Sequence, residues 1–84
     1  MGKQIVLIVD SDASVRQELR QLIRQRLRCA VSWECCNGLE AIKYINALQP
    51  DLVVMDVRLP GKDGFEGLET TEYAPSVIFT ANSP

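Results

Sequence analysis

Three carboxylates stand at the ends of two apolar runs in this chain. Residues 5–9 form one run, followed by Asp10 and Asp12, and residues 52–55 form another, followed by Asp56. If both runs are neighbouring parallel strands, their terminal acids converge at one sheet edge, which is unfavourable unless a cation neutralises them. Mg²⁺ is the natural candidate because it accepts one or two carboxylates and keeps phosphate oxygens as ligands. The pattern suits phosphoryl transfer, with a carboxylate as metal ligand or as nucleophile.

Asp56 is followed by a sequence that forces a tight turn. Residues 59–64 are Leu-Pro-Gly-Lys-Asp-Gly, in which Pro fixes φ and Gly permits positive φ. A solvated Asp that merely opens a loop is the alternative for Asp56 taken alone. The second strand with its own acids favours a ligand site, since the carboxyl ends of strands form the binding crevice of open α/β sheets.

Helical and strand patterns alternate along the chain. The first helix, with Ser11 or Asp12 as its cap, has an apolar face made of Val15, Leu19, Leu22, Ile23 and Leu27. The second, with Asn37 as its cap and Glu40 as the reciprocal partner, has an apolar face made of Leu39, Ile42, Ile45 and Leu48. Alternation of this kind predicts a parallel α/β sheet with right-handed crossovers.

The remaining segments are shorter. Residues 31–35 alternate apolar and polar types, which predicts a half-exposed edge strand whose Trp33 covers the sheet edge. Residues 65–72 form a weak, acidic helix candidate. Residues 77–79 form a third apolar run, typical of a buried strand, which stops at Thr80.

Arginines and cysteines suggest other roles, each with a plainer explanation. Arg16, Arg20 and Arg24 recur every four residues, which predicts a solvated helix face, with partner binding as the alternative. The three cysteines have no CxxC spacing and the chain has no histidine, so packed free thiols are favoured over a metal or redox site. These cysteines are Cys29, Cys35 and Cys36.

Size and charge exclude several classes of protein. Eighty-four residues make one small domain, and a net charge of -2 argues against a nucleic-acid surface on the whole chain. No apolar run approaches membrane-spanning length, and the first residues lack the architecture of a signal peptide. A cytoplasmic protein that contacts neither nucleic acid nor membrane is expected.

The chemistry-bearing residues together resemble the receiver domain of two-component response regulators. The resemblance rests on Asp10 with Asp12 close behind, Asp56, Leu59-Pro60-Gly61, Asp63-Gly64, and Thr80 at the end of a later apolar run. It extends from residue 4 to residue 83. It implies a flavodoxin-like (CheY-like) parallel sheet of strand order 2-1-3-4-5 with helices on both faces.

The resemblance also implies a role for each site residue. Asp56 would be the phosphoacceptor, taking a phosphoryl group from a phosphohistidine on a sensor histidine kinase or a phosphotransfer protein. Mg²⁺ would be held by Asp56 and the backbone carbonyl of Arg58, with Asp10 and Asp12 supplying negative charge. Thr80 would donate its hydroxyl to a phosphoryl oxygen. Such a chain is a phosphoacceptor signalling domain and not an enzyme.

Two departures from the family pattern change the expectations. Ser11 stands where the family usually has a second adjacent acid. The chain also ends soon after Thr80, whereas the family continues through helix, strand and helix with a lysine that contacts the phosphoryl group. Residues 1–84 are therefore expected to form a single, incomplete receiver domain. Its exposed apolar sheet edge should make it assemble with a second copy.

Two alternatives remain open. A degenerate or truncated receiver would act as an interaction module without phosphorylation. A haloacid-dehalogenase-like phosphatase would use the Asp10-Ser11-Asp12 segment as its DxD motif, with Asp10 as nucleophile and Thr80 ending a later strand. The second alternative leaves the turn after Asp56 unexplained.

Overall fold

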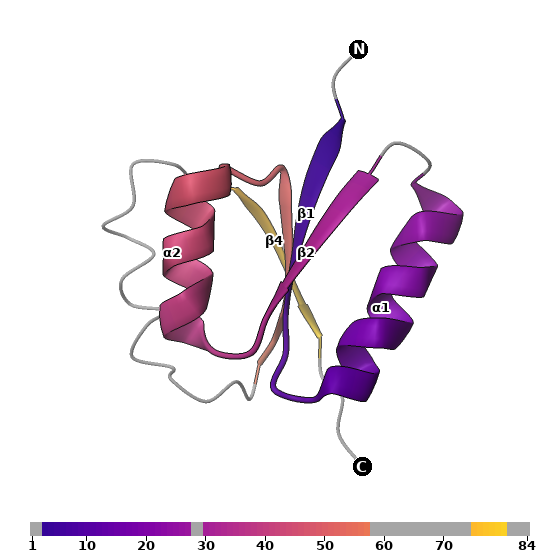
Figure 1. The fold of residues 1–84 in the computed structure, drawn as a ribbon, viewed down its shortest axis with the longest axis horizontal. Helices are drawn as coiled ribbons and strands as arrows, with labels where there is room; N and C mark the ends of the chain where they lie inside the picture. Colours follow the sequence, from indigo (N-terminus) through magenta and orange to yellow (C-terminus); the bar gives the residue numbers. More distant parts are fainter. Residues whose placement is uncertain (1–2, 28–29, 58–74, 81–84) are drawn as a thin grey trace.

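The computed structural model describes residues 3–27, 30–57 and 75–80, which form a parallel sheet between two helices (Figure 1). The elements are β1 (Gln4–Val9), α1 (Ala13–Arg26), β2 (Ala30–Cys35), α2 (Gly38–Leu48), β3 (Leu52–Asp56) and β4 (Ser76–Thr80). All pairings within the sheet are parallel, in the order β2-β1-β3-β4. This order matches the first four strands of the flavodoxin-like sheet and confirms the predicted fold class.

β1 is apolar from Ile5 to its end, and its residues from Val6 to Val9 are buried on both faces of the sheet. Its side chains alternate between two clusters, one beside α2 and one beside α1, which lie on opposite faces of the sheet (Figure 1). The first cluster contains Leu7, Val9, Cys35, Ala41, Ile45, Val53 and Met55. The second contains Val6, Ile8, Ile23 and Val54. The central strands are thus held from both sides, which fixes the direction of their carboxyl ends.

α1 is capped as predicted but buries a narrower face. The side chain of Asp12 accepts a hydrogen bond from the Ser14 N–H, and Leu27 is the C-cap of the helix. Ile23 is buried, and Leu19 and Leu27 pack partly against its cluster. The prediction that Leu22 belongs to this face was wrong, since Leu22 is 49% exposed. It lies about 100° around the helix from Ile23 and falls outside the stripe that meets the sheet.

α2 shows the same kind of correction. Its buried residues are Gly38, Ala41 and Ile45, whereas Leu39, predicted to lie in the core, is 64% exposed. Gly38 and Ala41 are small, so the start of the helix can approach the sheet closely. The sequence pattern favoured the larger apolar neighbour, because Gly and Ala carry little hydrophobic signal.

The two edge strands of the described sheet are both partly exposed. Trp33 in β2 is 45% exposed, in keeping with the predicted edge strand. In β4, Val77 packs against the α2-side cluster, but Ile78 is 53% and Phe79 is 55% exposed. The apolar run in β4 therefore belongs to an exposed strand of the described sheet, not to a fully buried one.

Several predictions fall on residues outside the described ranges. These are the turn at 59–64, the backbone carbonyl of Arg58, the helix at 65–72 and the environment of Cys29. Within the described ranges, neither helix combines the length and the apolar character that a bilayer crossing requires.

Candidate phosphoacceptor site

Register brings the predicted acids to the same edge of the sheet. Val9 at the end of β1 lies opposite Met55 of β3, and Asp56 lies opposite Thr80 of β4. Asp10 and Asp56 therefore follow paired residues on two adjacent parallel strands. The structure confirms that these two strands are parallel neighbours, which was the geometrical premise of the predicted site.

Asp10 is a buried acid with one unused oxygen. Its residue exposure is 2%, and its Oδ1 accepts a hydrogen bond of 2.9 Å from the Asp12 N–H. Its Oδ2 is buried and has no hydrogen-bond partner in the part of the chain that the structure describes. An unsatisfied buried polar atom destabilises a fold by about 1–3 kcal/mol, and more when it is charged. A cation is the kind of group that would satisfy this oxygen.

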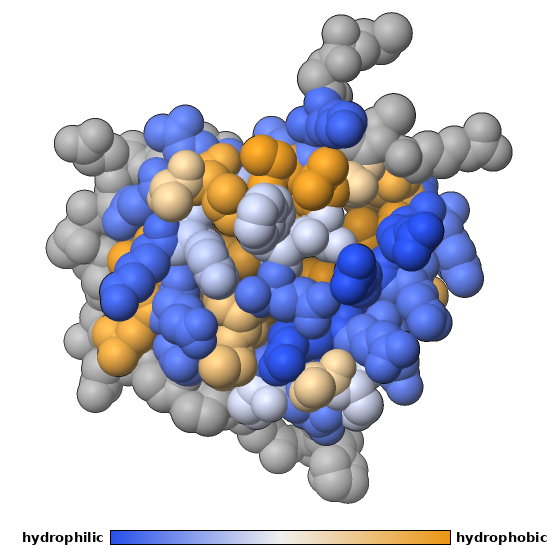
Figure 2. Space-filling model, in the orientation of Figure 1, coloured by the Kyte–Doolittle hydropathy of each residue, from blue (hydrophilic) through white to orange (hydrophobic). Residues whose placement is uncertain are grey.

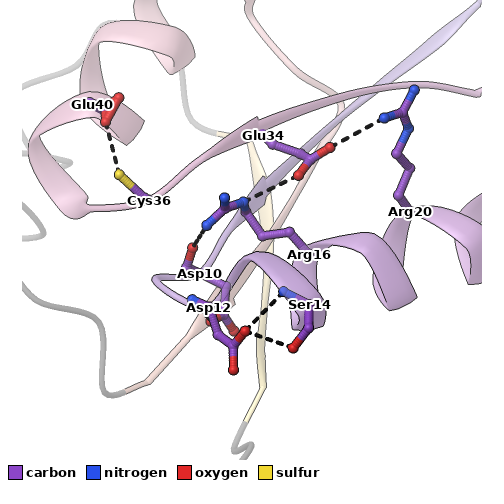
Figure 3. A network of polar contacts seen from close by, with 8 residues as sticks. All are labelled: Asp10, Asp12, Ser14, Arg16, Arg20, Glu34, Cys36 and Glu40. Atoms are coloured by element: carbon purple, nitrogen blue, oxygen red, sulfur yellow. Dashed lines mark hydrogen bonds and ion pairs between the residues drawn. The ribbon is translucent and has the colours of Figure 1, made fainter.

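Asp12 is exposed and serves α1. Its Oδ1 accepts hydrogen bonds from the Ser14 N–H at 2.9 Å and from the Ser14 Oγ at 2.7 Å (Figure 3). The bonds from Ser14, first the hydroxyl and then the amide, lower the pKa of Asp12 below its usual value. Asp12 therefore stays ionised at neutral pH and adds negative charge to the loop, with one oxygen engaged in capping.

Thr80 is tied to the strand that carries Asp56. Its Oγ1 donates to the carbonyl oxygen of Met55 at 3.4 Å, and its own carbonyl accepts from the Val57 N–H at 3.0 Å. Asp56 itself is half-buried at the end of β3. A hydroxyl and a carboxylate thus occupy opposite positions on two neighbouring strands, in the last residue pair of β3 and β4.

The donor set for a cation is only partly assembled among the described residues. No group of three or more His, Cys, Asp or Glu side chains lies close enough within those residues to hold a metal ion. The three predicted carboxylates therefore do not form one cluster within the described residues. One oxygen of Asp12 caps the helix, and Arg58 lies outside the described ranges. The buried, unpartnered Oδ2 of Asp10 is the feature that fits Mg²⁺.

Arg16 joins this loop to β2, a contact that sequence reasoning missed. Its Nη1 donates to the carbonyl oxygen of Asp10 at 2.7 Å, and its Nε lies 3.2 Å from Oε1 of Glu34 (Figure 3). Arg20 lies 3.5 Å from the other oxygen of Glu34. The surface on the α1 side of the molecule is mostly hydrophilic, in keeping with the predicted solvated face (Figure 2). That prediction was wrong for Arg16, whose side chain is 19% exposed.

The loop before α2 uses its polar groups locally. Asn37 Oδ1 accepts from the Glu40 N–H at 2.8 Å, and the thiol of the exposed Cys36 donates to Glu40 Oε1 at 3.2 Å. That bond, and then burial, raise the pKa of Cys36, while burial raises the pKa of Cys35 to about 12. Both thiols are free and protonated at neutral pH. The prediction of a packed thiol is confirmed for Cys35, which is buried, and was wrong for Cys36, which is exposed.

The sequence matches the model of the response regulator receiver domain over residues 6–83. It is 36% identical over 76 residues to an uncharacterized response regulatory protein of Yersinia pestis, covering 88% of this chain and 32% of that protein. It is 32% identical over 76 residues to the transcriptional regulatory protein BtsR of Escherichia coli K12, with the same two coverages. The chain thus spans about a third of the length of these curated relatives.

Solved structures give the same result. The response regulator domain of Thermotoga maritima CheB superposes with a TM-score of 0.73 and 28% sequence identity, covering 92% of this chain and 59% of that one. Sequence and fold comparisons therefore agree on the same kind of domain.

Proposed function

The chain belongs to the response regulator receiver domain family, and on that premise we propose that Asp56 accepts a phosphoryl group from a phosphohistidine. The donor would be a sensor histidine kinase or a phosphotransfer protein of a two-component system. The observation that carries the proposal is the register, which sets Asp56 opposite Thr80 and one strand away from the buried Asp10.

The chemistry asks mainly for positioning and charge neutralisation. A carboxylate oxygen of Asp56 forms a bond to phosphorus while the bond from phosphorus to the histidine nitrogen breaks, and that nitrogen keeps the electron pair. Thr80 donates its hydroxyl to a phosphoryl oxygen in exchange for its present acceptor, the Met55 carbonyl. This exchange would move the side chain of Thr80 towards Asp56 and so report phosphorylation at the surface.

The residues that would bind Mg²⁺ lie at the carboxyl ends of the same strands, β1 and β3. Asp10 and Asp56 would supply carboxylate oxygens and Arg58 its backbone carbonyl, with Asp12 adding negative charge. The unpartnered buried oxygen of Asp10 supports this assignment. When bound, Mg²⁺ neutralises the charge that the carboxylates and the phosphoryl group bring together.

Incubation with acetyl phosphate and Mg²⁺, followed by peptide mass mapping, tests the proposal. A phosphoryl group on Asp56, lost in Asp56→Asn and retained in the control Asp51→Asn at the other end of β3, is expected. Modification of Asp10 would favour the haloacid-dehalogenase-like alternative. No modification of any residue would favour an interaction module that acts without phosphorylation.

We further propose that two copies associate through β4. Ile78 and Phe79 are both more than half exposed on an edge strand of the described sheet, and a strand edge can pair with its own copy about a twofold axis. Light scattering at micromolar concentration should give a dimer, and Ile78→Lys should give a monomer. A wild-type monomer would reject the idea.

A cytoplasmic location, predicted from the sequence, stays a prediction.

A further inference from the structure

Arg16 occupies a position that is unfavourable for α1 itself. It lies four residues after the N-cap Asp12, and its N–H donates to the Asp12 carbonyl at 3.1 Å as part of the first turn. A cation near a helix N-terminus opposes the helix dipole, and Arg20 one turn later adds repulsion between like charges. The first turn itself contains no acidic residue, and the N-cap carboxylate of Asp12 attracts Arg16 without a hydrogen bond to it among the described residues. The hydrogen bonds of the Arg16 side chain lie outside the helix.

The side chain of Arg16 contacts Asp10, the residue that follows β1, and Glu34 on β2. Asp10 is fixed at three points: its N–H donates to the Cys35 carbonyl at 3.1 Å, its Oδ1 accepts from the Asp12 N–H, and its carbonyl accepts from Arg16. The first two bonds use backbone partners that any residues at those positions could supply. The third requires a long cationic side chain at position 16.

Glu34 sets the direction of the guanidinium. It accepts from Nε of Arg16, which leaves Nη1 of the same planar group to reach the Asp10 carbonyl (Figure 3). A guanidinium presents its donors in a rigid fork, whereas a lysine ammonium cannot bridge the two acceptors in the same way. The Arg16 and Glu34 side chains are 19% and 31% exposed, so this pair is screened less than a surface ion pair.

We propose, on the basis of the function proposed above, that Arg16 is a positioning residue for the cation site. Held by Glu34, it fixes the backbone of Asp10 so that the buried carboxylate keeps its unpartnered oxygen available to a divalent cation. Arg16 does not itself contact the cation. Among the described residues, Arg20 also contacts Glu34 but makes no hydrogen bond to Asp10, so it provides the matched control on the same helix.

The test uses Arg16→Met, Arg16→Lys and Arg20→Met in the full chain, with two readouts. Binding of Mn²⁺ alone is followed by electron paramagnetic resonance, and exchange of the Asp10 and Asp12 amide protons is followed by NMR. Arg16→Met should weaken Mn²⁺ binding roughly tenfold, as loss of a residue that orients a metal ligand does elsewhere. It should also speed exchange of these two amides more than exchange of the central amides of β3.

Arg16→Lys should recover only part of both effects, and Arg20→Met should stay within about twofold of wild type in Mn²⁺ binding. If Arg16→Met does not fold, Glu34→Gln replaces it and should shift both readouts in the same direction by a smaller amount. Equal effects of the Arg16 and Arg20 variants, or unchanged exchange of the two amides in a folded Arg16 variant, would overturn the proposal.

The exchange readout separates this proposal from the function on which it rests. If wild type takes no phosphoryl group on Asp56 but the Arg16→Met variant still weakens Mn²⁺ binding and loosens Asp10 and Asp12 selectively, the phosphoacceptor function fails and the positioning role stands. If wild type is phosphorylated on Asp56 and the variant changes neither Mn²⁺ binding nor amide exchange, the positioning role fails alone.

Discussion

The loops before α1 and before α2 perform the same local task in different ways. Each follows a parallel strand and begins a helix with a side-chain cap, Asp12 in one and Asn37 in the other. The loop before α2 uses its polar groups on itself, through Asn37, Glu40 and Cys36. The loop before α1 also buries Asp10, whose second carboxylate oxygen has no described hydrogen-bond partner.

The loop before α2 thus has a structural role only, whereas the loop before α1 also holds a candidate functional residue. Capping explains the second loop completely, since its side chains satisfy the first turn of α2. Capping does not explain why an ionisable group is buried at the end of β1, where it makes the fold less stable. Such a group is expected at a site that a ligand completes, and β1 is the strand that lies next to Asp56.

Of the substitutions in these two loops, Asp10→Asn should have the largest effect on function. It keeps an acceptor for the Asp12 N–H but removes the buried charge, so phosphorylation of Asp56 by acetyl phosphate should slow roughly hundredfold. The free energy of unfolding without Mg²⁺ should rise by about 1 kcal/mol, because an uncompensated charge has been removed. Urea unfolding and single-turnover phosphorylation measure the two effects. A variant that is less stable and equally active would make Asp10 a structural residue.

Asn37→Ala should show the opposite pattern. Loss of the cap of α2 should lower the free energy of unfolding by about 1 kcal/mol, measured by urea denaturation. Phosphorylation of Asp56 should not change, because this loop holds no site residue. Asn37→Ser, which keeps a capping oxygen, is the matched control and should recover most of the stability. A large loss of phosphorylation in a folded Asn37→Ala protein would remove the distinction between the loops.

The contribution of the Asp12 cap of α1 to the free energy of unfolding should depend on pH. The contribution of the neutral Asn37 cap of α2 should not. Hydrogen bonds from Ser14 lower the pKa of Asp12, so its contribution to stability is present above its unfolded value of 3.8 and is lost as pH falls through the folded pKa. Asp12→Ala should therefore be less stable than wild type at neutral pH, and the difference should shrink in acid. Urea unfolding across the acid range, with Asn37→Ala as the comparison, measures this. An equal pH dependence for both variants would contradict it.

The smallest expected effect concerns the two thiols at the end of β2. Burial raises the pKa of Cys35 from its ordinary value of 9.0 to about 12, so its contribution to stability is full below pH 9.0 and is lost as the pH rises from there towards 12. In the folded protein at neutral pH, iodoacetamide should modify Cys36 slowly and Cys35 only when the fold opens. Peptide mapping with and without urea gives both rates. Equal rates in the folded protein would place Cys35 outside the core.

The sheet and the position of the acids could be predicted because they depend on strong local patterns. Apolar runs that lie buried on both faces indicate central parallel strands, and the acid that follows each run then marks the sheet edge. The buried faces of the helices were predicted less well because they depend on tertiary packing. Ala41 lies in the core in place of Leu39 because helix α2 rotates so that its small residues meet the sheet.

Arg16 was missed for a related reason. Its contact to Asp10 crosses only six residues, but its partner Glu34 lies on β2, and no periodic pattern links a helix residue to an edge strand. Its spacing with Arg20 and Arg24 suggested a single solvated face. The signal that could have found it is the charge itself, since a cation in the first turns of a helix needs a compensating contact.

If the buried carboxylate of Asp10 is a ligand of a cation that completes the site with Asp56, Mg²⁺ must stabilise the folded protein through Asp10. The melting temperatures of wild type and Asp10→Asn as Mg²⁺ is added measure this, because a ligand that binds only the folded state stabilises it. We expect Mg²⁺ to raise the melting temperature of wild type and to leave that of Asp10→Asn unchanged. An equal rise in both proteins, or none in wild type, would contradict it.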